Sequence, residues 1–224
     1  MGEPLKLVAM PTIEHSKLLR NAARKALGSI GVAQKGRSRT WIDDRGWWIC
    51  VVEFQPSTWS LGSYLNVGCM WLWHEKDYFS FDEGYRIGGF ESFQNADQFR
   101  RVATTLAERA AVEVGRYRSL FRTVQMVSDH YLRTMPGGFW PSFHAAVACG
   151  LVGRSPEARR FFRPILESDD KRDWVLAAQA EAVRLNAMVL DTNAFQQFVE
   201  EKVARTRTLL KLPAWQEFGL GSSL

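Results

Sequence analysis

Tryptophan is concentrated in one stretch of this chain. Six of its nine tryptophans lie between Trp41 and Trp73, where apolar residues alternate and Gly, Pro and Ser interrupt the pattern. Alternation with period two indicates β-strands, because successive side chains of a strand point to opposite faces of the sheet. Two runs give matching apolar faces, formed by Trp48, Cys50, Val52 and Phe54 and then by Leu65, Val67, Cys69, Trp71 and Trp73. The stretch predicts an antiparallel meander with one fully buried face.

The opposite face of the meander mixes apolar and polar residues. We expect this face to be partly exposed, with its polar residues gathered where a ligand or a second layer could sit. An exposed cluster of Trp47, Trp59 and Met70 would mark an interface there. The candidate binding residues are Trp47, Glu53, Gln55, Trp59, Asn66 and Met70.

Helical periodicity flanks the meander. Apolar residues at helical spacing predict a helix over residues 15–27, which Gly28 would end. Strands are expected over residues 38–43, 47–55, 63–74 and 85–90, with a short aromatic piece at 78–81. After Asn95 the apolar spacing changes to three or four residues, which predicts one long helix over 96–133 and then helices over 141–152, 156–166, 173–190 and 194–211.

These elements predict an α+β fold. It comprises an N-terminal helix, a four- to five-stranded antiparallel meander, a long backing helix and then α-helical hairpins. The expected domains are residues 1–134, an α+β sheet domain with its long helix, and residues 135–212, a helical region. Residues 213–224, rich in Gly and Ser, are expected to be a flexible tail.

Composition restricts the environment of the protein. No apolar run approaches the ~20 residues of a membrane-spanning helix, so no membrane association is predicted. The start of the chain lacks a signal-peptide pattern. Cys50, Cys69 and Cys149 are odd in number and lie in apolar surroundings, which is typical of reduced thiols. Together these features predict a cytoplasmic protein.

The charge balance leaves a nucleic-acid partner open. The chain has 29 Lys and Arg against 24 Asp and Glu, a net charge of +5. Arg37 and Arg39 lie among aromatic residues and are the nucleic-acid candidates, because stacking rings beside arginines are typical of single-strand binding surfaces. The sequence motifs of RNA-recognition domains are absent.

Three catalytic or nucleotide-binding motifs are incomplete or absent in this sequence. Residues 31–38 nearly match a phosphate-binding loop, but they leave a helix and enter a strand, the reverse of the required context. Asp43, Glu53 and Gln55 resemble the carboxylate hairpin of metal-dependent nucleases, although Gln55 cannot supply the expected amine. No serine nucleophile elbow appears, so acyl transfer is not predicted.

No metal site and no cofactor is predicted. The histidines, which are His15, His74, His130 and His144, do not pair with one another or with a cysteine at a metal-ligand spacing.

Several short motifs carry a family resemblance. They are Gly31, Arg39 and Trp41, the segment VEFQPS at residues 52–57, and the segment YLNVG at residues 64–68. Over roughly residues 13–133 the chain resembles the domain-of-unknown-function family 4304. The resemblance implies an N-terminal helix followed by a small antiparallel sheet, and it implies no activity.

The sequence favours a non-enzymatic cytoplasmic protein that binds another macromolecule. A protein partner in a bacterial defence or immunity setting is the leading hypothesis, and it rests on the missing catalytic motifs and the mixed outer face of the sheet. The alternatives are a metal-dependent nuclease-like domain that uses the carboxylate hairpin and a basic nucleic-acid-binding module. The oligomeric state stays open.

Overall fold

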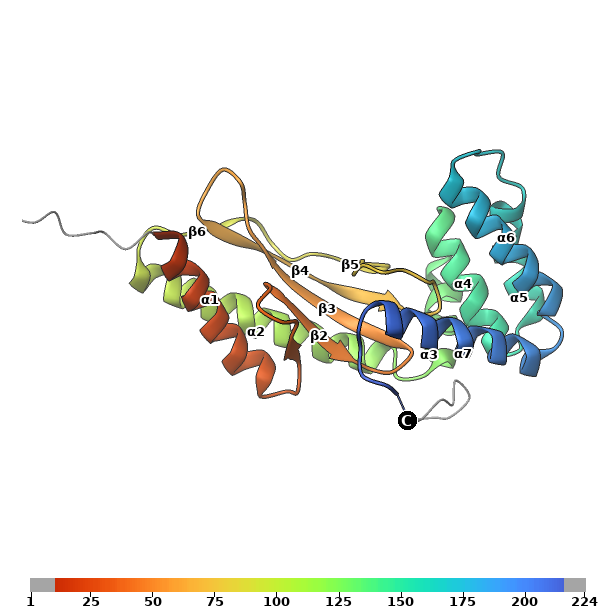
Figure 1. The fold of residues 1–224 in the computed structure, drawn as a ribbon, viewed down its shortest axis with the longest axis horizontal. Helices are drawn as coiled ribbons and strands as arrows, with labels where there is room; N and C mark the ends of the chain where they lie inside the picture. Colours follow the sequence, from red (N-terminus) through yellow and green to blue (C-terminus); the bar gives the residue numbers. More distant parts are fainter. Residues whose placement is uncertain (1–10, 216–224) are drawn as a thin grey trace, which may run out of the picture. The chain divides into compact units, whose positions relative to one another are not determined.

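The computed structural model describes residues 11–215 and has an α+β fold. The chain divides into two compact units, each assembled from separate segments (Figure 1). The sheet unit contains residues 11–44, Cys50–Cys69 and Glu83–Gly115. The helical unit contains Arg45–Ile49, Met70–Asp82 and residues 116–215. The sequence predicted contiguous domains instead, at 1–134 and 135–212. Most of the predicted tail, residues 216–224, lies outside the described residues.

The predicted antiparallel sheet is present. Its strands are β1 (Ala33–Gln34), β2 (Thr40–Asp44), β3 (Trp48–Gln55), β4 (Gly62–Trp71), β5 (Glu83–Arg86) and β6 (Glu91–Ser92). Neighbours follow chain order from β1 to β5, and β6 pairs with β4. In the antiparallel β4–β5 pair, Gly68 lies opposite Gly84. A Cβ at Gly84 would collide with the backbone of Gly68, so the absence of a side chain permits this pairing.

The strand predictions fail mainly at short elements. The strand expected over residues 63–74 ends at Trp71, and residues 78–81 form no strand. The edge strand begins at Glu83 rather than Tyr85. Strands β1 and β6 have two residues each, which is too short for an alternating pattern to be recognised.

Two helices belong to the sheet unit. Helix α1 (Pro11–Gly28) contains the predicted helix and begins earlier. Helix α2 (Ala96–Leu120) begins where the sequence indicated, although its last turn is grouped with the helical unit. The ring of His15 on α1 packs edge-on against Phe99 on α2, with centroids 5.9 Å apart.

The prediction of one helix over residues 96–133 is wrong. Helix α2 ends at Leu120, and helix α3 (Val124–Thr134) begins after Thr123. Thr123 has an extended backbone, and its hydroxyl oxygen accepts a hydrogen bond from the amide of Met126 at 3.2 Å. The threonine therefore caps a new helix. Apolar spacing alone does not reveal this break, because buried Phe121, Val124 and Val127 continue the helical period across it.

The four C-terminal helices are confirmed to within a few residues. They are α4 (Phe139–Leu151), α5 (Ser155–Leu166), α6 (Asp173–Met188) and α7 (Thr192–Leu209). Helix α4 contacts α3, α5 and α7, while α6 contacts α5 and α7. Every residue from Ser142 to Leu151 is buried, so α4 forms the centre of the helical unit. A Cβ at Gly150 would collide with the Phe195 ring, so glycine allows α4 and α7 to approach closely.

The three cysteines are buried and are not joined in disulfides, as predicted. Within residues 11–215, no helix has the length and apolar character needed to cross a membrane.

Candidate functional site

A pocket of about 610 Å³ opens in the helical unit. Its volume lies in the range of ligand-binding pockets. The walls come from the segment that follows β4 and from helices α4, α6 and α7. We call this cavity the aromatic pocket, and its ring-bearing residues are His74, Tyr78, Trp140, Trp174 and Phe198.

Stacked rings form one wall of the aromatic pocket. The rings of Trp140 and Trp174 lie 5.5 Å apart at an interplanar angle of 27°. The His74 ring lies 4.2 Å from Trp140 on the same wall. Trp174 is 40% exposed and Tyr78 is 62% exposed. Large aromatic side chains therefore remain open to solvent at the pocket, although burying them would be favourable.

Charged residues of both signs line the same pocket. The acidic residues are Glu75, Asp77 and Glu181, and the basic residues are Lys76, Arg184 and Lys202. The ammonium group of Lys202 donates a hydrogen bond to Glu181 Oε2 at 2.9 Å and lies 3.5 Å from Glu75 Oε2. The pocket therefore has balanced charge and suits neither a strongly anionic nor a strongly cationic ligand.

Glu181 retains an oxygen that no side chain or backbone group satisfies. Its Oε1 is buried and has no hydrogen-bond partner in the part of the chain that the structure describes. Burial raises the pKa of Glu181, and the nearby Lys202 opposes this shift. Glu181 therefore keeps one carboxyl oxygen with unused hydrogen-bonding capacity in the wall of the pocket.

His74 supplies a neutral ring beside the tryptophans. Burial, with the charge of Lys76 and then His144, lowers the pKa of His74 to about 3. At neutral pH the imidazole is therefore uncharged. Its Nδ1 is also buried without a hydrogen-bond partner among the described residues. His74 and Glu181 thus leave two buried polar atoms beside the pocket without a partner among the described residues.

A buried polar chain supports the segment that carries His74. Trp73 Nε1 donates a hydrogen bond to His144 Nδ1 at 3.1 Å, and His144 Nε2 lies 3.9 Å from Asp82 Oδ1. Lys76 binds the same Asp82 oxygen at 2.6 Å, and the Trp71 amide donates to Asp82 Oδ2 at 2.9 Å. These contacts tie both ends of the segment between β4 and β5 together.

The contacts between these buried polar residues keep Asp82 charged. Burial alone would raise the pKa of Asp82, but His144, Lys76 and the two hydrogen bonds together lower it. Asp82 is therefore ionised at neutral pH and balances the buried Lys76 ammonium group.

The structure brings three of the predicted binding residues together, in the sheet unit. The Asn66 side-chain amide donates to Glu53 Oε2 at 2.9 Å and to Gln55 Oε1 at 3.0 Å. Arg86 completes this group by donating to Asn66 Oδ1 at 3.1 Å, and it lies over the Tyr64 ring. The polar residues do gather on one face of the sheet, but they satisfy one another there.

The predicted exposed cluster of Trp47, Trp59 and Met70 is wrong. Trp47 is only 9% exposed and Met70 is completely buried, whereas Trp59 is 93% exposed. Ile49 and Val51 lie on the second face of β3, directly after Trp47, and an apolar pattern on both faces is typical of a strand that is covered on both sides.

The carboxylate hairpin does not form a metal-binding group. Asp43 is 3% exposed within β2, and Glu53 is bound to Asn66. Among the residues described, no three His, Cys, Asp or Glu side chains come close enough to hold a metal ion. The nuclease alternative therefore gains no support from the geometry of Asp43, Glu53 and Gln55.

Sequence reasoning missed the residues of the aromatic pocket. Trp140 and Trp174 lie outside the tryptophan-rich stretch, each near the start of a helix, and Glu181 and Lys202 lie on different helices. Only packing of the helices brings them together. No local sequence pattern marks these residues as neighbours, and the 40% exposure of Trp174 is visible only in the structure.

The comparisons with known proteins found no relatives. No family model matches the chain, and neither a curated protein nor a solved structure matches it. The resemblance to the domain-of-unknown-function family 4304 therefore stays a prediction that rests on its short motifs.

Proposed function

We propose that this protein binds another protein and that the aromatic pocket of the helical unit receives a side chain of the partner. The observation that carries the proposal is the stacked pair Trp140–Trp174 beside the unsatisfied Glu181 Oε1. A bound group with a flat apolar surface and an N–H or O–H donor would satisfy both features.

The partner side chains that fit best are tryptophan, tyrosine and arginine. Each combines a planar surface with hydrogen-bond donors, and these three residues dominate the energetics of protein interfaces. The balanced charges around the pocket, with Asp77 and Arg184 among the exposed ones, suit the mixed polar rim of an interface. A pocket for a small ligand usually encloses that ligand on most sides. Tyr78 and Trp174 are more exposed than such a pocket requires.

The proposal departs from the sheet surface that the sequence favoured. It keeps the hypothesis of a protein partner and moves the binding site to the helical unit. A catalytic role is not proposed, and the bacterial defence or immunity setting stays a prediction.

Peptide selection tests the proposal. Peptides selected from a displayed random library on the purified full chain are expected to be enriched in Trp, Tyr or Arg. Trp174→Ala should weaken their binding by about tenfold or more, as for a central interface residue. Binding is measured by fluorescence anisotropy with labelled peptides.

Leu176→Ala is the matched control, because Leu176 is on the same helix, is 43% exposed and does not line the pocket. Its affinity should stay within about twofold of the original protein, as expected for a residue outside the binding surface. Selected peptides that bind Trp174→Ala as tightly as the original protein would refute the proposal.

A further inference from the structure

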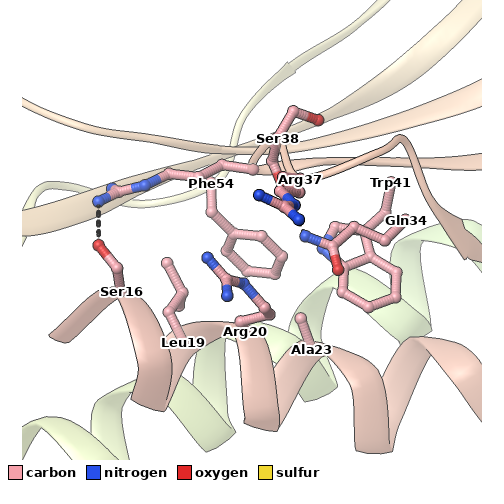
Figure 2. A pocket seen from close by; sticks show the side chains of 10 residues that line it. Ser16, Leu19, Arg20, Ala23, Gln34, Arg37, Ser38, Trp41 and Phe54 are labelled. Carbon is pink, nitrogen blue, oxygen red and sulfur yellow. Dashed lines mark hydrogen bonds between the residues drawn. The ribbon is translucent and has the colours of Figure 1, made fainter. Parts of the chain in front are cut away.

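A second, smaller pocket lies in the sheet unit and gathers three arginines. Its volume is about 100 Å³. Figure 2 shows it between α1 and the chain that leads from β1 into β2. Arg20 comes from α1, whereas Arg37 and Arg39 come from the turn between the two strands. We call it the arginine pocket, and no acidic residue among those the structure describes lines it.

Local structure holds the arginines in place. The turn is closed by hydrogen bonds from the Lys35 amide to the Thr40 carbonyl oxygen at 2.9 Å and from the Gln34 side chain to the Ser38 carbonyl oxygen at 2.7 Å. The Phe54 amide donates to the Arg39 carbonyl oxygen at 3.1 Å, which ties the turn to β3. The pocket is therefore largely formed before any ligand binds.

Arg39 is the innermost of the three arginines. Its Nη2 donates to Ser16 Oγ at 2.7 Å and lies 3.1 Å from His15 Nε2. Its Nη1 is buried and has no hydrogen-bond partner within residues 11–215. Arg39 as a whole is half-buried, and its positive charge has no acidic partner among the described residues, so the charge is only partly solvated and is not compensated.

The surroundings increase this cost. Leu19, Ala23, Trp41 and Phe54 form an apolar floor. Burial, and then the positive charge of Arg20, lowers the pKa of Arg39 from its ordinary value. Arginine nevertheless stays charged in proteins, so positive charges converge here. A bound anion would relieve the repulsion between these positive charges.

We propose that the arginine pocket binds a phosphate group, either as inorganic phosphate or as the terminal phosphate of a phosphomonoester. Arginine forks match the oxygens of phosphate, and a dianion balances more of the three positive charges than a carboxylate does. A volume of about 100 Å³ corresponds to roughly three water molecules, which suits a compact oxyanion and leaves no space for a base or sugar.

The same geometry argues against nucleic acid at this pocket. Single-strand binding needs exposed rings on which bases stack. The rings beside the arginines are those of Trp41 and Phe54, which are only 3% and 1% exposed. The predicted nucleic-acid candidates Arg37 and Arg39 do meet in one pocket, but without a stacking surface.

Calorimetric titration of the full chain at constant ionic strength in chloride buffer tests the proposal. Orthophosphate and phenyl phosphate are the probes, with acetate and a single-stranded oligonucleotide as comparisons. We expect one-site binding of at least one phosphate probe, with a Kd of about 1 mM or tighter. Binding by phenyl phosphate would identify the ligand as a phosphomonoester, and binding by orthophosphate alone would identify the free ion.

Exposed arginines provide variants that should still fold. Arg20→Gln and Arg37→Gln should each weaken phosphate binding by about tenfold, since each removes a charge-assisted contact. Arg24→Gln removes the same charge from an exposed position of α1 outside the pocket and should leave the affinity within about twofold, since it removes no contact with the ligand.

Four results would overturn the proposal. They are no heat with either phosphate probe, acetate binding as tightly as phosphate, oligonucleotide binding without phosphate binding, and equal weakening by Arg24→Gln and Arg37→Gln.

Discussion

Asp82→Asn is expected to lower the free energy of unfolding by about 3 kcal/mol at pH 7, because it leaves the Lys76 ammonium group buried without its counter-charge. The side chains of Lys76 and Asp82 are only 8% and 6% exposed. Chemical denaturation followed by tryptophan fluorescence measures the change. Combining Asp82→Asn with Lys76→Met should recover part of the loss, since it also removes the uncompensated charge.

The loss of stability in Asp82→Asn should become smaller as the pH falls. The folded protein lowers the pKa of Asp82 from its ordinary value of 3.8. The contribution of the carboxylate is therefore fully present above that value and is lost as the pH falls through the lower, folded-state pKa. The difference between the original protein and Asp82→Asn should shrink accordingly in acid.

Asp77→Asn is the matched control for Asp82→Asn. It removes the same charge from an exposed residue of the same segment and should change stability by less than about 0.5 kcal/mol. Equal stability of Asp82→Asn and Asp77→Asn would show that the buried polar contacts of Asp82 do not stabilise the segment between β4 and β5.

Trp71→Ala is expected to destabilise the protein by about 3–5 kcal/mol, the range for removing a large aromatic side chain from a core. Trp71 is completely buried. Its ring stacks with Trp73 at a centroid distance of 4.9 Å and meets Phe121 edge-on at 5.0 Å. Its Nε1 donates to the Tyr131 hydroxyl oxygen at 2.8 Å. Thermal or denaturant unfolding measures the loss.

Two substitutions separate the contributions of Trp71. Trp71→Phe keeps a ring in place and should cost less than Trp71→Ala, because part of the buried area and stacking remains. Trp59→Ala, at a 93% exposed position, should leave stability within about 0.5 kcal/mol. A loss for Trp71→Ala no larger than that for Trp59→Ala would contradict the role of the buried rings.

The sequence predicts the sheet well because its signal is local. Alternating residues such as Trp48, Cys50 and Val52 define the strands, and Pro and Gly residues define their ends. The same alternation says less about whether other parts of the protein cover each face of the sheet. The apolar residues Trp47 and Met70 on the second face predict an exposed cluster together with Trp59, yet Trp47 and Met70 are buried. Periodicity shows which residues share a face and does not show what covers that face.

The candidate site could not be predicted in the same way. Its residues range from His74 to Leu209, and four separate elements supply them. Their proximity follows from how α4, α6 and α7 pack, and no local pattern records that packing. The cap at Thr123 escaped detection for a related reason, because a hydrogen bond between its side chain and a backbone amide overrides a continuous apolar period.

Site-specific photocrosslinking in the native cells tests the proposed binding site most directly. A photoreactive phenylalanine analogue is introduced in place of Tyr78, in place of Trp174 and, as a control, in place of Val183, which is 57% exposed on α6 and lies outside the aromatic pocket. We expect a discrete light-dependent protein adduct from positions 78 and 174 and none from position 183. The same adducts from all three positions, or none from positions 78 and 174, would contradict it.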